Sequence, residues 1–158
     1  MSSSADGIQP KAPSGPSNSS NPSAPHPRMR HEIQIIFGDT DQMGVVYYAN
    51  YLRYFEGARA AYWRGLGKSY KDLEAWGIAL PVVEAHCYYK RPAYYEDVIA
   101  VETWVSELRG ASLRFAYNIY RGDLRLAEGT TRHGVIGSDG RPRALPPALR
   151  AAIPPIVP

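Results

Sequence analysis

The residues with the clearest potential for chemistry lie in segment 37–59, which reads FGDTDQMGVVYYANYLRYFEGAR. Two carboxylates, Asp39 and Asp41, fall in a polar loop that runs directly into a helical sequence. The N-terminus of a helix presents unpaired N–H groups and a partial positive charge, which can stabilise a developing oxyanion. A carboxylate beside such a site can attack a carbonyl or activate a water molecule. The same spacing also fits a simpler role, in which both aspartates form turns or cap the helix.

Other common catalytic chemistries lack their signatures here. The sequence has no Gly-x-Ser-x-Gly elbow and no glycine-rich phosphate loop before a helix. Its four histidines do not have the spacing of metal ligands, and its one cysteine, Cys87, cannot form an internal disulfide or a zinc cluster. We therefore expect no metal and no cofactor. The net charge is +3 and the arginines are scattered, so no nucleic-acid partner is expected.

The composition divides the chain into a tail and one domain. Residues 1–28 contain eight Ser, six Pro, two Gly and two Asn, whereas all 18 aromatic residues lie between Phe37 and Tyr120. A segment this poor in large apolar groups cannot offset the entropy cost of ordering, so residues 1–29 are predicted to be disordered and 30–158 to form the domain. No run approaches the ~18 apolar residues of a membrane span, and no secretory signal is present. With a single cysteine, this predicts a cytoplasmic protein without membrane insertion.

The elements that must position the loop follow from the periodicity of the apolar residues. A strand is predicted at 31–37, and apolar positions spaced i, i+3, i+4, i+7 predict a helix from Asn50 to Leu66. After a short helix at 69–76, alternating segments joined by tight turns predict strands at 79–90, 98–108, 113–120 and 124–136, with a terminal helix from Pro146. Alternation with hairpin turns indicates one buried sheet face, which the long helix can cover. The predicted fold is α+β, a curved antiparallel sheet of about five strands wrapped around one central helix.

The loop and helix resemble the 4-hydroxybenzoyl-CoA thioesterase family of hotdog-fold acyl-CoA thioesterases. The residues that carry the resemblance are Phe37, Asp39-Thr40-Asp41, Gly44, Val45-Val46-Tyr47, Tyr51, Glu56 and Ala58-Arg59. Further matches follow in order at 80–83, 89–93, Asp97 and 127–130, so the resemblance covers essentially all of 31–147. It implies the hotdog fold, which agrees with the sheet and helix predicted from periodicity, and it implies thioester hydrolysis.

The resemblance also implies roles for individual residues. Asp41 matches the catalytic carboxylate, acting as nucleophile or as general base on water, and Gly44 would let the loop approach the substrate closely. Tyr48 stands where a backbone N–H polarises the thioester carbonyl, although many relatives carry His at that position. The expected substrate-binding residues are Val45, Tyr47, Tyr51, Glu56, Arg91 and Arg109, with the two arginines contacting the CoA phosphates. A thioester needs little more, because its carbonyl lacks strong resonance donation and its thiolate leaves readily.

Glu56 has two interpretations. It could form an ion pair at the surface or at an interface with Arg59, three residues further along the helix. Alternatively, it could line the acyl pocket, at the position where a relative acting on aromatic acyl groups carries an acid. The sequence favours the ion pair, because long charged side chains at this spacing commonly pair.

The expected function is hydrolysis of an acyl-CoA, with an aromatic or short-chain acyl group, to free acid and CoA. Because sites of this fold form between protomers, a homodimer or a homotetramer made of two dimers is expected. Two alternatives are a thioesterase acting on an acyl chain held by a carrier protein and a non-catalytic acyl-binding module. The carrier-protein enzymes tend to carry Asn in place of Asp41, and the intact motif argues against a binding module. A hotdog dehydratase is the least favoured alternative, because residues 50–66 contain no His where that enzyme carries its catalytic His on the long helix.

Overall fold

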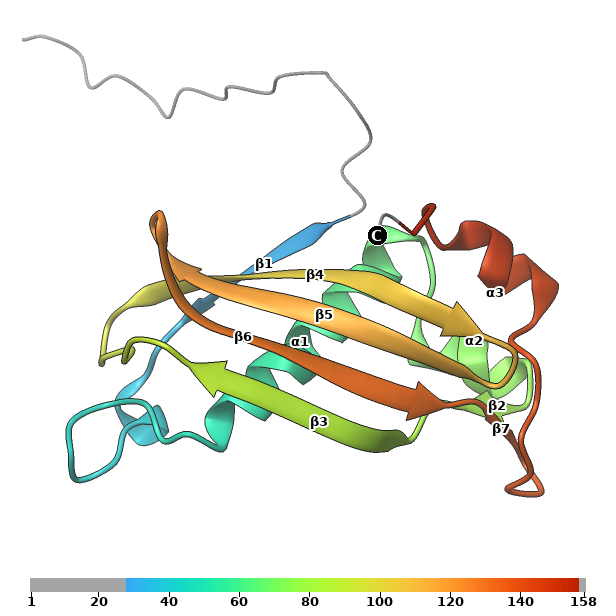
Figure 1. Ribbon diagram of the computed structural model, residues 1–158, viewed down its shortest axis with the longest axis horizontal. Helices are drawn as coiled ribbons and strands as arrows, with labels where there is room; N and C mark the ends of the chain where they lie inside the picture. The colour runs from blue at the N-terminus through green and yellow to red at the C-terminus, as the bar shows by residue number, and fades with distance from the viewer. Residues whose placement is uncertain (1–27, 157–158) are drawn as a thin grey trace, which may run out of the picture.

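The computed structural model describes residues 28–156, which form a curved antiparallel sheet lying across one long helix (Figure 1). The sheet has five strands in the order β1-β4-β5-β6-β3. Its strands are β1 (Met29–Gln34), β3 (Val82–Tyr89), β4 (Val98–Arg109), β5 (Ser112–Arg121) and β6 (Leu124–Gly134). The remaining elements are the 3-10 turn η1 (Phe37–Asp39), the helices α1 (Asn50–Gly65), α2 (Tyr70–Ala75) and α3 (Pro147–Ala152), and the short strand pair β2 (Ile78–Ala79) and β7 (Ile136–Gly137).

The predicted long helix, sheet and hairpins are confirmed, with local differences at their ends. The first strand begins at Met29, two residues earlier than expected, and ends at Gln34 because the chain then turns into η1. The strand expected at 79–90 is divided into β2 and β3 at Pro81, which has no N–H for the ladder. The predicted disordered tail lies outside the described residues, apart from 28 and 29. No helix within residues 28–156 is long and apolar enough to cross a membrane.

The core forms where the helical period of α1 meets the two-residue period of the sheet. The buried face of α1 includes Tyr51, Tyr54, Phe55, Ala58 and Tyr62, and β5 presents Leu113, Phe115, Tyr117 and Ile119 toward it. Phe55 and Tyr117 stack face to face, with ring centroids 4.1 Å apart and an interplanar angle of 11°. These side chains are almost completely excluded from water, so they supply much of the hydrophobic stabilisation of the fold.

Gly129 of β6 sets how closely α1 can approach the sheet. A Cβ atom at this position would lie 2.7 Å from the Phe55 ring and 2.4 Å from the carbonyl oxygen of His86 on β3. Both distances are shorter than a carbon atom tolerates, so the Phe55 ring packs directly against the backbone of β6 at Gly129. Sequence alternation alone does not reveal this requirement.

Gly129→Ala should therefore destabilise the protein by about 1–3 kcal/mol, because the added methyl group overpacks a core that has no room for it. Urea unfolding followed by tryptophan fluorescence measures the change. Gly134→Ala is the matched control, because a Cβ atom there would meet only Val83, at an ordinary 3.8 Å. Equal stabilities for the two variants would contradict the close-approach interpretation.

Candidate active site

A cleft of about 280 Å³ lies at the N-terminal end of α1, where the loop after η1 meets the end of β3. The loop contributes Asp41, Met43, Val45 and Val46, the start of the helix contributes Tyr48 and Tyr51, and the segment after β3 contributes Tyr89, Lys90, Arg91 and Pro92. The predicted residues Asp41, Val45, Tyr48, Tyr51 and Arg91 thus line one cleft, although they are up to 50 positions apart in the sequence. Its lining combines one carboxylate, several aromatic rings and two cations.

Asp41 stands at the start of a tight turn that fixes its carboxylate. Its backbone N–H donates to the Val45 carbonyl at 2.9 Å, and its carbonyl accepts from the N–H of Gly44 at 2.9 Å. Its Oδ1 accepts from the N–H of Met43 at 2.9 Å. Within the described residues Oδ2 makes no hydrogen bond, so one carboxylate oxygen is held by the turn while the other is available to a ligand.

Asp39 has a different role from Asp41. It is 7% exposed, and its Oδ2 accepts from the N–H of Ile36 at 3.1 Å. Its carbonyl accepts from the N–H of Tyr47 and from Nδ2 of Asn50, both at 2.9 Å. Both aspartates therefore form turns, as the sequence allowed, but Asp39 is buried and ties the loop to the start of α1, whereas Asp41 keeps one carboxylate oxygen unbonded within the described residues.

The start of α1 leaves backbone N–H groups without partners. Ala49 occupies the N-cap position, and no side chain caps the helix. The N–H groups of Asn50 and Tyr51 donate to carbonyl oxygens of the preceding turn, whereas those of Tyr48 and Ala49 make no hydrogen bond within the described chain. Uncapped N–H groups at the positive end of a helix form a site for negative charge.

Tyr89 joins the end of β3 to this helix terminus. Its hydroxyl donates to the Tyr48 carbonyl at 2.9 Å, and its ring meets that of Tyr51 edge-to-face at 5.0 Å. Burial is the main cause that raises the pKa of Tyr89, so its phenol stays protonated and keeps donating at physiological pH. Tyr48, Tyr51 and Tyr89 form a largely apolar part of the lining of the cleft that also holds Asp41.

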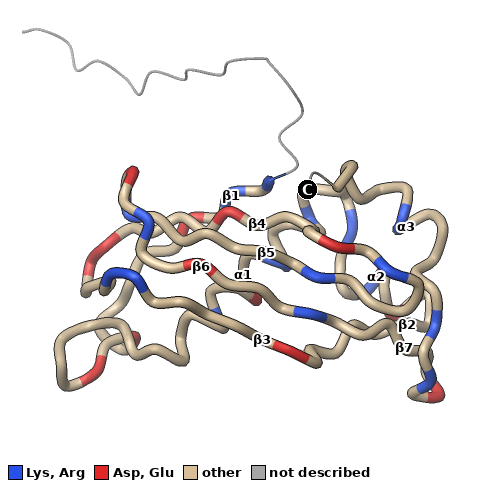
Figure 2. The backbone as a smooth tube through the Cα atoms, viewed as in Figure 1, with Lys and Arg blue, Asp and Glu red and all other residues tan. Residues whose placement is uncertain are grey.

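Two cations stand at the rim of the cleft. Lys90 pairs with Glu128 at 3.4 Å, whereas Arg91 has no carboxylate within ion-pair distance in the described part of the chain. Figure 2 shows acidic and basic positions interspersed over the sheet in this view, without a continuous basic stripe. A free guanidinium at the rim suits an anionic ligand tail.

Comparison with known proteins identifies the family to which this loop and helix belong. Residues 35–153 match the profile of the thioesterase-like superfamily. The chain belongs to this superfamily. It is 38% identical over 106 residues to the putative acyl-CoA thioesterase YneP of Bacillus subtilis, covering 66% of this chain and 76% of that protein. It is 34% identical over 122 residues to the acyl-CoA thioesterase YbgC of Haemophilus influenzae, covering 76% and 90%.

Solved structures share the fold of this thioesterase. A protein from Thermus thermophilus has a TM-score of 0.76 at 34% identity, covering 81% of this chain and 98% of that chain. A thioesterase for DHNA-CoA from Staphylococcus aureus has a TM-score of 0.75 at 32% identity, covering 79% and 87%. The hotdog fold and the thioester-hydrolase family expected from the motif are thereby confirmed.

Several predicted site residues of this thioesterase lie outside the cleft. Tyr47 packs its ring against Tyr48 at 4.8 Å but does not line the cleft. Arg109 lies at the hairpin between β4 and β5, where its neighbour Ser112 pairs with Gly134. The backbone N–H groups of Lys90 and Arg91, by contrast, donate hydrogen bonds to the carbonyl of Leu126, near the other end of β6. Eight residues of strand, about 26 Å, separate these ends, so within one protomer Arg109 does not reach the cleft.

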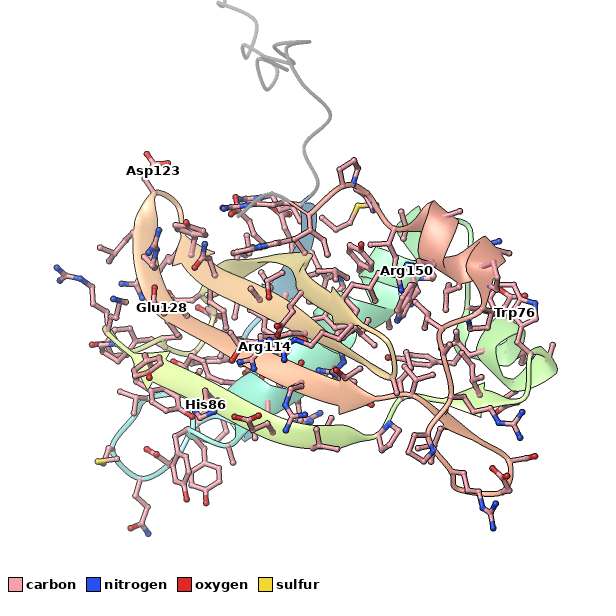
Figure 3. The ribbon with its side chains drawn as sticks, turned by 45° about the vertical axis from the view of Figure 1, so that its right-hand side comes forward. Trp76, His86, Arg114, Asp123, Glu128 and Arg150 are labelled. Atoms are coloured by element: carbon pink, nitrogen blue, oxygen red, sulfur yellow. The ribbon has the colours of Figure 1, made fainter. Side chains whose placement is uncertain are left out.

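Arg109 belongs to a separate cleft of about 140 Å³, together with Glu107, Ser112, Arg114 and Arg132. Glu107 pairs with Arg109 and lies 3.4 Å from Arg114, so both arginines already have an anionic partner. Figure 3 shows Arg114, Glu128 and His86 along the outer face of the sheet, away from α1. The expectation that Arg109 joins Arg91 in one binding surface is not met within the protomer.

The ion pair expected between Glu56 and Arg59 is absent from the described residues. Glu56 is exposed, whereas Arg59 is 8% exposed and turns into the interface between α1 and the sheet. The sequence interpretation was wrong here because helical spacing places two side chains on one face but does not set their depths. Both residues line another cleft of about 320 Å³, between α1 and β3.

Sequence reasoning missed Tyr89 as a wall of the site, although the alternation of β3 could have indicated it. Ala85, Cys87 and Tyr89 share the face that turns toward α1, opposite Thr131, Gly129 and Ala127 of β6. A tyrosine at the end of that face, beside the start of the helix, was the available signal. Nothing in the sequence indicated that Met43 and Pro92 would complete the lining.

Gly44 carries a backbone requirement that can be tested by substitution. Its φ is +76° and a Cβ atom there would meet nothing within 4 Å, so conformation rather than space demands glycine. Gly44→Ala should lower kcat/KM for an acyl-CoA several-fold, because a strain of about 1 kcal/mol shifts the turn that holds Asp41. Gly44→Asn should retain more activity, because Asn tolerates positive φ.

The matched control is Gly38→Ala in the same segment, where φ is not in the left-handed region and a Cβ atom also meets open space. Steady-state kinetics and melting temperature are measured for all three variants. A Gly38→Ala variant as impaired as Gly44→Ala would show that the segment tolerates no substitution and that φ at Gly44 is not the cause.

Proposed function

We propose that this protein hydrolyses the thioester of an acyl-CoA to a free acid and CoA, with Asp41 and the backbone N–H of Tyr48 as the catalytic groups. The observation that carries the proposal is that a carboxylate with one free oxygen and an uncapped helix start line the same cleft. The N–H of Tyr48 would donate to the thioester oxygen as the carbonyl becomes tetrahedral. Asp41 would supply the nucleophile, either its own oxygen or a water molecule from which it takes a proton.

The chemistry balances without a further group. An oxygen bonds to the carbonyl carbon, the C–S bond breaks, and the CoA thiolate leaves and takes up a proton. When Asp41 itself attacks, water then cleaves the acyl-aspartate anhydride and restores the carboxylate. Both routes start from the same free Oδ2, and neither requires an acidic side chain at position 48, where this chain carries Tyr.

The size and lining of the cleft favour a short or single-ring acyl group. A volume of about 280 Å³ lies just below the usual range of about 300–1,000 Å³ for small-molecule sites. Tyr48, Tyr51 and Tyr89 form a wall suited to an aromatic ring or a short chain. Arg91, without an anionic partner at the rim, would hold a phosphate of CoA, and this remote binding energy would position the carbonyl.

Asp41→Asn should lower kcat at least about 100-fold against a panel of short, long and aromatic acyl-CoAs, because the amide can neither attack nor accept the proton. Release of free thiol measures the rate. Asp123→Asn is the matched control, because Asp123 lies exposed at the β5–β6 hairpin (Figure 3). Hydrolysis that survives in Asp41→Asn at a similar kcat would refute the assignment, and turnover of only an acylated carrier protein would replace CoA as the substrate.

The edge strand β3 would join two copies of the chain into a homodimer. β3 pairs with β6 on one side only, and Val82, Val83 and Tyr88 are 49%, 52% and 64% exposed. A long edge strand with exposed apolar side chains is a template for pairing with a second strand. Two such dimers would make the homotetramer that the resemblance implies, and a cytoplasmic location remains a prediction.

Val83→Lys combined with Tyr88→Lys should convert the assembly to monomers, because charges would then meet across the paired edges. Sedimentation equilibrium gives the mass. Leu124→Lys, 37% exposed on β6, is the matched control and should leave the mass unchanged. A wild-type monomer, or a dimer that survives both lysines, would rule out assembly through β3.

A further inference from the structure

Arg59 begins a buried chain of hydrogen bonds that the proposed catalysis does not use. Its Nη1 donates to the Tyr117 hydroxyl at 3.1 Å, and that hydroxyl lies 2.7 Å from Oγ1 of Thr131. Oγ1 of Thr131 lies 2.9 Å from Nε2 of His133, whose Nδ1 lies 2.9 Å from the Leu80 carbonyl. The four side chains are each at most 8% exposed, so the chain crosses the interior between α1 and the sheet.

The direction of this chain follows from its end. A carbonyl only accepts, so Nδ1 of His133 carries a proton and donates to Leu80. Burial is the main cause that lowers the pKa of His133, so its Nε2 is unprotonated at neutral pH and accepts from Thr131. Thr131 then accepts from Tyr117, and Tyr117 accepts from Arg59. Each group in this chain therefore has a hydrogen-bond partner, and the chain uses one N–H donor of Arg59.

Arg59 therefore retains both its charge and most of its donors. A guanidinium has five N–H donors, and one is used here. No carboxylate lies within 4.0 Å of Arg59 among residues 28–156. No nitrogen of Arg59 is both fully buried and without a hydrogen bond in residues 28–156, so its remaining donors are open at the clefts that it lines.

Arg59 lines a small cleft of about 30 Å³ together with Tyr70, and it also lines a larger cleft between α1 and β3. The larger cleft has a volume of about 320 Å³ and is lined by Leu52, Arg53, Glu56, Arg59, Val82, Ala85 and Thr131. Leu52, Val82 and Ala85 give it apolar walls, and Arg59 lies at its buried side. Arg53 lies 3.9 Å from Asp39, so Arg59 and Glu56 are the charges of this lining without an ion-pair partner in residues 28–156. The shape suits an apolar chain that ends in an oxygen acceptor.

A second copy of the chain would bring this cleft to a catalytic loop. Tyr89, at one end of β3, lines the Asp41 cleft, and Val82, at the other end, lines the Arg59 cleft. Antiparallel pairing of two β3 strands along their full length places Tyr89 of the partner subunit beside Val82. The two clefts, about 23 Å apart along one strand, then become neighbours across the interface.

We propose that Arg59 is a specificity-determining residue that binds an oxygen acceptor at the far end of the acyl group, while the thioester lies in the partner subunit's catalytic cleft. The acceptor is a carboxylate or a phenolic oxygen, and the carboxylate is preferred because its two oxygens match the guanidinium fork. This inference rests on the proposed function for the reaction, but it concerns which acyl groups are chosen.

Two matched substrate pairs test the preference. Glutaryl-CoA and 5-methylhexanoyl-CoA have the same length and end shape, but only the first ends in a carboxylate. 4-Hydroxybenzoyl-CoA and 4-methylbenzoyl-CoA differ in the same way for a phenolic oxygen. In one pair or both, kcat/KM of the wild-type enzyme should favour the acceptor-bearing member at least about tenfold. No preference in either pair would overturn the proposal, and the pair that shows it identifies the acceptor.

Variants of Arg59 assign the preference to this residue. Arg59→Met keeps the apolar stem and should abolish the preference while hydrolysis of the neutral member continues. Arg59→Lys keeps the stem and charge but loses the fork, so the preference should fall at least about threefold, and this variant decides the question if Arg59→Met does not fold. An unchanged preference in the variant that folds would overturn the assignment.

Mixed dimers test whether Asp41 of one chain and Arg59 of the other chain act in the same site across the interface. A dimer of one Asp41→Asn chain and one Arg59→Met chain would contain one site with both residues intact. Purified mixed dimers should regain up to half of the wild-type rate on the preferred substrate. No recovery would place Asp41 and Arg59 in the same protomer's site and overturn the proposed arrangement.

Binding separates this proposal from the proposed reaction. Calorimetry with the Asp41→Asn protein measures the Kd of each substrate pair without requiring turnover. A preference for the acceptor-bearing member that disappears on adding Arg59→Met supports the role of Arg59, even where hydrolysis by the wild-type enzyme fails. Equal Kd values within both pairs would overturn it, even where hydrolysis succeeds.

Discussion

Phe55 can lie flat on Tyr117 only because Gly129 has no side chain, and this contact sets how α1 crosses the sheet. Phe55 lies about one and a half turns from the start of α1, so this contact helps to fix the position of that end of the helix. Since Tyr89 donates to the Tyr48 carbonyl, the end of β3 also fixes where the helix begins. A densely packed core resists small displacements. The contacts of Phe55 and Tyr89 therefore fix the position of the uncapped helix start more than the loop does.

The loop in turn depends on a division of labour between its two aspartates. Asp39 is buried and its carbonyl and carboxylate are occupied by the loop and the helix, which leaves it nothing to offer a substrate. Asp41, two residues on, uses one oxygen for the turn and keeps the other free. A carboxylate that is held by its turn and lines the same cleft as an uncapped helix start would be preorganised, so little reorganisation would accompany the change in charge during a reaction. Because no side chain caps α1, the N–H groups at its start and their partial positive charge remain available to a ligand.

Patterns of the sequence predicted the elements well, because each follows from local periodicity. The alternation of β5 and the helical spacing from Tyr51 to Tyr62 each describe one face of one element. The motif also brought Asp41, Tyr48 and Tyr51 together, since they are neighbours along the chain. Arg91 was reached only through the resemblance, because β3 must return to the helix start before it can line the cleft. Neither periodicity nor the resemblance predicts how deeply a side chain is buried or at which end of the sheet it lies. Arg59 is buried rather than paired with Glu56, and Arg109 lies near the end of β6 that is remote from the Asp41 cleft.

The edge strand β3 connects the buried position of Arg59 to the proposed assembly. Within a protomer, the Asp41 cleft and the Arg59 cleft occupy opposite ends of β3, and neither is closed. A two-fold pairing reverses the strand, so the end that is remote in one chain becomes adjacent in the pair. Arg59, whose charge finds no carboxylate in its own described chain, would then meet a ligand held by the other copy. In a dimer, the buried charge of Arg59 would belong to a pocket that both copies of the chain complete. A single protomer then need not supply a carboxylate to balance that charge.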